Sequence, residues 1–131
     1  MTDTGKLVLR LVLGVLILLH GISKVMNGID PILAGVTKAG LPQAFGYLVY
    51  VGEVLAPILI IVGFLTRPAA LVIMINMLFA IYLVHTSQFF TLGKTGGWAL
   101  ELQGMYLFTA LAIALLGAGR FSLGGTANRW N

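Results

Sequence analysis

Residues 44–65 read AFGYLVYVGEVLAPILIIVGFL, an apolar run that contains a single carboxylate, Glu53, and a single proline, Pro57. A helix needs about 20 apolar residues to cross the hydrocarbon of a bilayer, and this run is long enough. It shows no alternation with a period of two, which argues against a strand of a membrane barrel. Because backbone groups cannot stay unpaired in lipid, we expect residues 44–65 to form a transmembrane helix.

The composition of the whole chain supports a membrane location. Its 131 residues are 59% hydrophobic and only 9% charged, whereas a soluble domain carries about 25% charged residues. A soluble protein with a very large exposed apolar patch is the alternative. We expect an integral membrane protein whose main partner is the lipid bilayer.

The absence of cysteine and the scattered charge exclude several function classes. The chain has no Cys, so it has no disulfide framework, thiolate metal site or thiol nucleophile of its own. Its net charge of +4 comes from single Lys and Arg residues rather than from a basic block. This pattern is typical of loops beside anionic headgroups and does not indicate a nucleic-acid partner.

The hydropathy pattern predicts an all-α membrane protein with four transmembrane helices in an up-down-up-down bundle, the second kinked at Pro57. One domain covers 1–131, and the expected spans are 7–26, 44–65, 69–90 and 98–118. The first run lacks a clear cleavage site, so we interpret it as a span rather than a signal peptide. Its Gly and Pro residues make the segment between the first two spans an expected irregular loop.

The charges of the connections predict the orientation. An even number of spans places both termini on one side, and that side carries five Lys or Arg residues against three on the other. The positive-inside rule then favours cytoplasmic termini.

Each predicted span carries ionisable groups, which are expensive in lipid and mark function or pairing. At about 1.5 Å per residue, all except Arg10 lie in the half of the bilayer away from the termini. We expect a single polar pocket there, opening outward, and we expect Arg10 to snorkel to its own interface. The candidate ligand-binding residues are His20, Lys24, Glu53, His85 and Glu101.

Several of these residues have simpler interpretations. Lys24 alone is most simply a snorkelling anchor. His85 and Glu101 lie near the interface, where a solvated side chain costs little. Asn76, in mid-span, is typical of interhelical hydrogen bonding, and Tyr106 either donates to a ligand or fills space.

Glu53 differs from these residues because it is too deep and too short to snorkel. It must be protonated, paired with His20 or Lys24, or exposed to water, and burial favours a proton-handling role. Pro57 lacks the N–H that would bond to the Glu53 carbonyl, so that carbonyl is expected to be free. No metal site is predicted, because the Glu-x-x-His repeat of di-iron bundles is absent.

Three segments resemble one known family. LRLVLGVLILLHGISKV (9–25), the run from Gly46 to His85, and GGWALELQGMYLFTALAIALLGAGRFSL (96–123) are similar to the DoxX family of small bacterial membrane proteins. The shared motifs are HG-x-x-K, G-E-x-x-x-P, G-x-x-T-R-P and G-x-G-R-x-S. The last motif usually continues into an aspartate, whereas this chain has Gly124.

The resemblance implies a four-helix protein of the bacterial inner membrane with a link to redox metabolism, since relatives include a quinone-reducing subunit of thiosulfate oxidation. The family's shared positions map onto the five candidate residues and Arg67.

Three functions follow from these features. The leading hypothesis is a quinone-linked oxidoreductase subunit, with His20 or His85 bonding a quinone carbonyl and Glu53 and Glu101 as proton carriers. The alternatives are a non-catalytic anchor or assembly subunit for a soluble oxidoreductase partner, and transport of a small solute or protons by a homo-oligomer.

Overall fold

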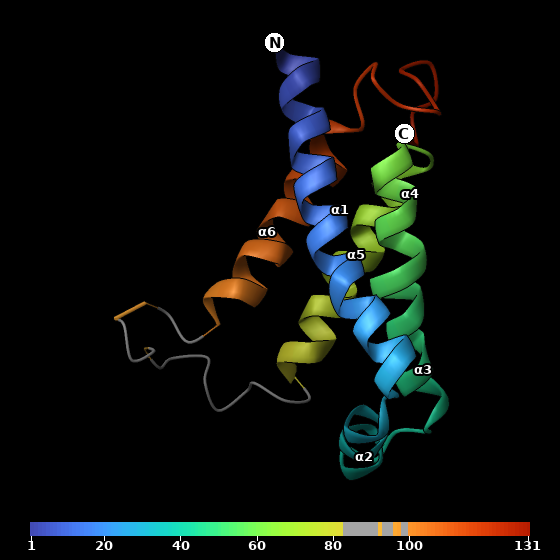
Figure 1. The fold of residues 1–131 in the computed structure, drawn as a ribbon, viewed down its shortest axis with the longest axis vertical. Helices are drawn as coiled ribbons and strands as arrows, with labels where there is room; N and C mark the ends of the chain where they lie inside the picture. The colour runs from blue at the N-terminus through green and yellow to red at the C-terminus, as the bar shows by residue number, and fades with distance from the viewer. Residues whose placement is uncertain (83–91, 93–95, 98–99) are drawn as a thin grey trace.

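The computed structural model describes residues 1–82, 92, 96–97 and 100–131, and the elements within them are helical (Figure 1). They are α1 (Thr2–Asn27), α2 (Asp30–Lys38), α3 (Ala44–Tyr50), the π-helical turn η1 (Val51–Leu55), α4 (Ala56–Val62), α5 (Thr66–Ala80) and α6 (Glu101–Leu116). Since α3, η1 and α4 follow one another without a break, they form one continuous helix, Ala44–Val62. The helices predicted at 7–26 and 44–65 are confirmed as helices.

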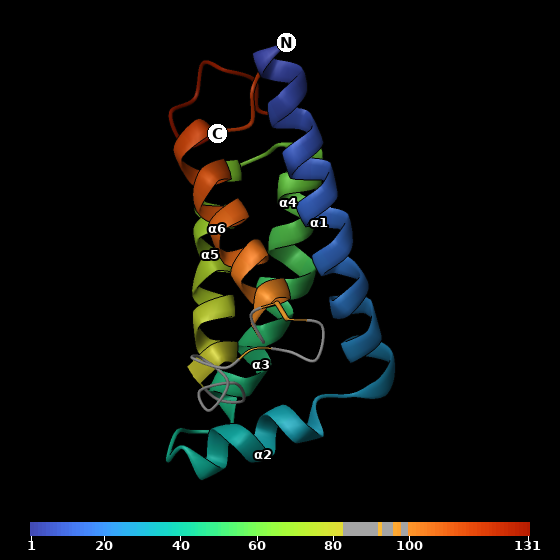
Figure 2. The ribbon, with the colours of Figure 1, turned by 90° about the vertical axis from the view of Figure 1, so that its left-hand side faces the viewer.

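The long helices lie side by side, and the short one crosses them. α1, the Ala44–Val62 helix, α5 and α6 run along the long axis, while α2 lies across one end (Figures 1 and 2). Both chain termini lie at the opposite end. The end with the termini is called the terminal end below, and the other is called the α2 end.

The packed interior is small and the outer surface is apolar. Ile17, Ile60, Ile73 and Ile113 meet in the core with small residues such as Ala110. Large apolar side chains of every long helix are exposed, which is unusual for a protein in water. By length and composition α1 and the Ala44–Val62 helix could each cross a membrane, while α5 and α6 are shorter apolar helices.

Arg10 corrects one expectation, because it does not snorkel. Its side chain is only 1% exposed and points inward at the terminal end. The guanidinium donates to the carbonyls of Ile60 (2.9 Å) and Ile61 (3.1 Å) in α4, and of Ala118 (2.8 Å) and Phe121 (2.9 Å) after α6. The fixed fork of five N–H donors makes such a four-carbonyl contact possible. Arg10 therefore ties three parts of the chain together.

Asn131 satisfies the start of α5 in a similar way. Its side-chain carbonyl accepts from the Thr66 hydroxyl (3.0 Å) and the Thr66 N–H (3.3 Å), and its amide donates to Ser122 (3.2 Å) and Gly125 (2.8 Å). The first N–H groups of a helix have no partner within it, so these contacts cap α5. A Cβ built on Gly124 would lie 2.8 Å from the Asn131 side chain. The Asn131 amide thus occupies the space beside position 124.

The segment between the first two long helices is not an irregular loop, so that expectation was wrong. Residues Asp30–Lys38 form α2, with Pro31 in its first turn. Proline is tolerated there because the first N–H groups of a helix lack acceptors in any case. The glycines Gly28 and Gly40, both with positive φ, flank the helix and let the chain turn sharply on either side.

Candidate functional site

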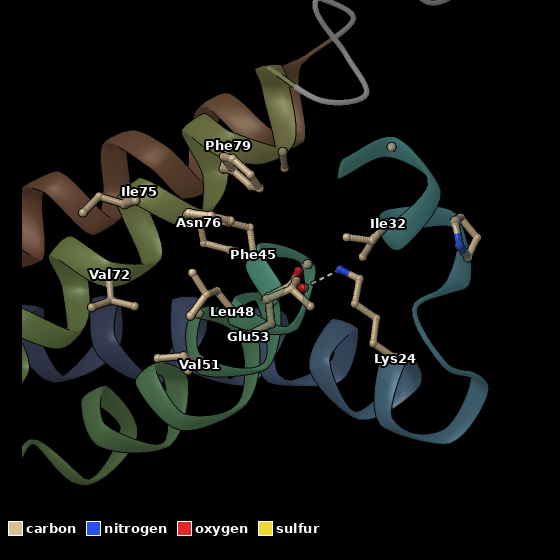
Figure 3. Close-up of a pocket in the computed structure, with 16 residues that line it drawn as sticks. Lys24, Ile32, Phe45, Leu48, Val51, Glu53, Val72, Ile75, Asn76 and Phe79 are labelled. Atoms are coloured by element: carbon tan, nitrogen blue, oxygen red, sulfur yellow. Dashed lines mark hydrogen bonds and ion pairs between the residues drawn. The ribbon is translucent and has the colours of Figure 1, made fainter. Parts of the chain in front are cut away.

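The centre of the site is an ion pair between α1 and η1. Lys24 donates to the Oε2 atom of Glu53, and Glu53 is 5% exposed whereas Lys24 is partly exposed (Figure 3). A carboxylate this deeply buried requires a partner, because the cost of removing a charge from water is large. Of the fates that the sequence leaves open for Glu53, the structure shows pairing with Lys24. Lys24 therefore turns inward rather than acting as a snorkelling anchor.

The backbone of η1 places Glu53 against α1. In this turn the N–H of Ala56 donates to the carbonyl of Val51, five residues earlier, and Pro57 follows without an N–H. The Glu53 carbonyl lies beside Gly21, where an added Cβ would be only 2.0 Å from that oxygen. Gly21 is thus the residue that lets the two helices approach closely enough for Lys24 to reach Glu53.

A cavity of about 690 Å³ opens on one side of this pair. Among the residues that the structure describes, the polar side chains in its wall are Lys24, Glu53 and Asn76, and the rest of the wall is predominantly apolar. Figure 3 shows apolar side chains that line it from α2, from α3 and η1, and from α5: Ile32, Phe45, Leu48, Val51, Val72, Ile75 and Phe79.

The large cavity reaches the apolar outer surface between α3 and α5. Its wall includes Leu48, which is 56% exposed, and Ile75, which is 62% exposed. α2 covers the cavity at the α2 end through Pro31, Ile32 and Gly35. The space is therefore a pocket with a polar region at the ion pair and an opening toward the surface that would face lipid.

A smaller cavity of about 200 Å³ lies on the other side of the pair, between α1, α5 and α6. Polar side chains make up much of its wall: His20, Lys24, Glu53, Gln103 and Tyr106. The His20 and Tyr106 rings meet edge to face, with centroids 6.0 Å apart at an interplanar angle of 78°. Lys24, Glu53 and Ala80 line both cavities and so form the wall between them.

The structure brings together three of the five candidate residues. His20, Lys24 and Glu53 share the small cavity, as the i, i+4 spacing of the first two suggests. Glu101 is the exposed first residue of α6 and does not line either cavity. His85 lies outside the residues that the structure describes. Within the described residues no group of three or more His, Cys, Asp or Glu could hold a metal ion.

Sequence reasoning undervalued two parts of the site. The sequence suggested that Asn76 forms an interhelical hydrogen bond, but its side chain lines the large cavity and packs against Gly52. The α2 wall was missed because Gly and Pro residues dominate that segment. The signal that could have found α2 is Asp30-Pro31 followed by Ile32 and Val36, an acidic first turn and a Pro start before apolar residues.

These features define a small membrane protein whose described elements are helices and whose α2 end is hollowed. The sequence model of the DoxX family matches residues 5–86, and the chain belongs to this family. The matched region runs from the first turn of α1 beyond the end of α5 and includes Lys24, Glu53 and the described residues of the large cavity.

One curated relative carries a functional name. "Putative oxidoreductase CatD" of Bacillus subtilis (strain 168) is 26% identical over 116 residues, which cover 88% of this chain and 81% of that protein. No solved structure matches the chain significantly.

Proposed function

We propose that the protein is redox-associated and that its large cavity binds a small hydrophobic acceptor such as a quinone. The observation that carries this proposal is the cavity itself, about 690 Å³ of predominantly apolar wall with polar side chains gathered around Lys24 and Glu53. Ligand pockets for molecules of this size are typically about 300–1,000 Å³, apolar, and fitted with a few polar groups. A substituted ring with carbonyl groups and an apolar tail matches that distribution.

The polar residues of the large cavity have distinct roles in this proposal. The Lys24 ammonium and the Asn76 amide are donors for a quinone carbonyl, because both line the cavity. Glu53 carries protons, since a buried carboxyl near a reacting group can serve as a general acid or base. His20 lines only the smaller cavity, so Lys24 and Asn76 replace it as the proposed carbonyl donors.

The exposed side chains at the cavity mouth favour a ligand that arrives from the bilayer. Leu48 and Ile75 belong both to the cavity wall and to the apolar outer surface. A quinone dissolved in lipid could enter between α3 and α5 and leave its tail among the acyl chains. The relative named as an oxidoreductase supports the redox context, and electrons would come from a soluble partner or directly from a reductant.

The proposed membrane arrangement is four spans in an up-down-up-down bundle, one domain, both termini in the cytoplasm of a bacterium and a bend at Pro57. The shared end of the two termini supports an even number of crossings. Single cysteines can test it, since the chain has no Cys. Thr126→Cys should react with an impermeant thiol reagent only after spheroplasts are opened, and labelling of intact spheroplasts would contradict the orientation.

Calorimetric titration of the purified protein in detergent with a short-tailed ubiquinone tests the proposed ligand. Wild type should bind it, and Asn76→Leu should bind about two- to tenfold more weakly, because it removes one of the proposed carbonyl donors and a neutral hydrogen bond contributes about 0.5–1.5 kcal/mol. An alcohol with the same tail but no ring is the control and should not compete. Failure of wild type to bind, or equal competition by the alcohol, would refute the proposal.

A further inference from the structure

The two cavities on either side of the Lys24–Glu53 pair differ in chemistry as well as size. The large one has a predominantly apolar wall, whereas polar side chains surround much of the small one. Both spaces are open on one side, so the chemistry of the wall decides what fills them: an ordered water needs about two to four polar partners, and an apolar wall offers it none. Five polar side chains of the described residues line the small cavity, and its volume of about 200 Å³ is enough for several waters.

We infer that the small cavity is a water-filled compartment from which Glu53 exchanges protons, while the body of the large cavity stays dry for the hydrophobic ligand. Glu53 belongs to both walls, so it can take a proton from water on one side and present it on the other. The division into wet and dry cavities stands on the cavities alone, and the delivery of that proton to a ligand rests on the proposed function.

The groups around Glu53 fit a proton route through the small cavity. α1 contributes Lys24, bonded to the carboxylate, and His20, one turn earlier. α6 contributes Tyr106, whose ring contacts His20, while α3 contributes Tyr50, whose hydroxyl donates to the Lys24 carbonyl (3.4 Å). From α5 the small cavity receives the non-titrating Met77 and Ala80. His20 is exposed and also lines the small cavity, and its imidazole has one nitrogen that donates and one that accepts, so it is suited to pass protons between the surface and the compartment.

Cysteines placed on one helix can distinguish a wet cavity from a dry one. Met77 lines only the small cavity, Val72 lines only the large cavity, and Ile73 is buried in the core and lines neither; all three lie on α5. The chain is free of Cys, so each substitution adds a single thiol. Thiols react as thiolates, which form in water and are suppressed in apolar surroundings.

The experiment measures labelling of the folded protein in detergent by 2-aminoethyl methanethiosulfonate, a small charged reagent, with intact mass as the readout. Met77→Cys should react at least tenfold faster than Val72→Cys and Ile73→Cys. Gln103→Cys, on the α6 wall of the small cavity, is the second variant in case Met77→Cys does not fold. The inference is overturned if both small-cavity cysteines react as slowly as Ile73→Cys, or if Val72→Cys reacts as fast as they do.

Addition of a saturating short-tailed ubiquinone separates this inference from the proposed function. Labelling of Met77→Cys should be unchanged, because the ligand and the water would occupy different cavities. Fast labelling without any quinone binding would support the wet compartment and refute only the proposed ligand. Quinone binding that blocks the labelling of Met77→Cys would overturn the inference, because the two cavities would then act as one.

Discussion

Glu53 and Lys24 are charged residues that lie within apolar helices, where contact with lipid would favour apolar side chains. A carboxylate in the middle of an apolar run is costly, and the structure offsets that cost with an ammonium from α1. Both groups border the two cavities. Apolar side chains can often replace a buried ion pair at little cost in stability, so the pair itself is weak evidence for a structural role. Its position between the two cavities is stronger evidence for a role in function.

Removal of Lys24 alone should destabilise the protein more than removal of the pair. Lys24→Met leaves a buried carboxyl without its partner, which in buried pairs costs about 3–5 kcal/mol, less here since Lys24 is partly exposed. Lys24→Met/Glu53→Gln removes both charges and should unfold at a higher temperature than Lys24→Met. Thermal unfolding in detergent measures both, and a double variant less stable than the single one would contradict the prediction.

Alanine substitutions at Gly21 and Gly5, both on α1, should change stability in opposite directions. Gly21→Ala places a methyl group against the Glu53 carbonyl, and overpacking of this kind costs about 1–3 kcal/mol. Gly5 has no atoms within 4 Å of its added Cβ, so Gly5→Ala should gain up to about 1 kcal/mol from helix propensity. Thermal unfolding midpoints should move down for the first variant and up for the second; equal shifts would show that Gly21 is not a contact point.

At the scale of elements, the start of α5 depends on a residue far along the chain. Asn131 caps Thr66 and occupies the space beside Gly124. Arg67, in the same first turn, donates from its side chain to the Leu115 carbonyl of α6 (3.3 Å) and from its backbone N–H to Trp130 (3.0 Å). Hydrogen bonds from Arg67 to backbone carbonyls thus hold α5 and α6 together at the terminal end.

The effect of Gly124→Asp on stability should therefore depend on residue 131: the substitution should destabilise the protein when Asn131 is present and stabilise it when residue 131 is Ala. In wild type the new side chain would collide with the Asn131 amide and lower the unfolding midpoint. Asn131→Ala alone should cost about 1 kcal/mol or more through the lost cap, and Gly124→Asp added to it should recover part of that loss. A double-mutant cycle of unfolding midpoints measures the coupling, and additive effects would contradict it.

On the scale of the whole molecule, the two ends have different tasks. The terminal end is locked by Arg10, Arg67 and Asn131, which bind backbone or side-chain groups of distant segments. The α2 end contains both cavities and the ion pair. A densely hydrogen-bonded end opposite a hollow one agrees with the proposal that the protein admits a ligand without losing its fold.

Arg10 should be essential for the stability of the terminal end. Arg10→Met abolishes four hydrogen bonds to carbonyls, and since bonds from a charged donor contribute about 1.5–3 kcal/mol each, the loss should exceed about 3 kcal/mol. Arg10→Lys keeps the charge but not the planar fork, so it should recover only a minor part. The midpoint of thermal unfolding in detergent is the measurement, and a lysine variant as stable as wild type would contradict the role of the fork.

The sequence predicted the helical class, the first two long helices and the group of His20, Lys24 and Glu53, because apolar length and intramembrane charge are local signals. It left the state of Glu53 open between protonation, exposure to water and pairing with His20 or Lys24, since the choice of Lys24 depends on how Gly21 packs. It placed Arg10 wrongly at the membrane interface. An arginine near the end of an apolar run can snorkel or be buried, and the carbonyls that bind Arg10 come from segments far away in the sequence. It missed the cavity walls for the same reason: a cavity belongs to several helices at once.

The most direct test of the central claim is to fill the large cavity and measure ligand affinity. Val72→Trp places a large ring in the cavity wall. Leu71→Trp places the same ring at the preceding position of α5, which is exposed and does not line the cavity. Calorimetric titration with a short-tailed ubiquinone should show binding close to wild type for Leu71→Trp and none for Val72→Trp. Equal binding by the two variants would place the ligand elsewhere and contradict the account.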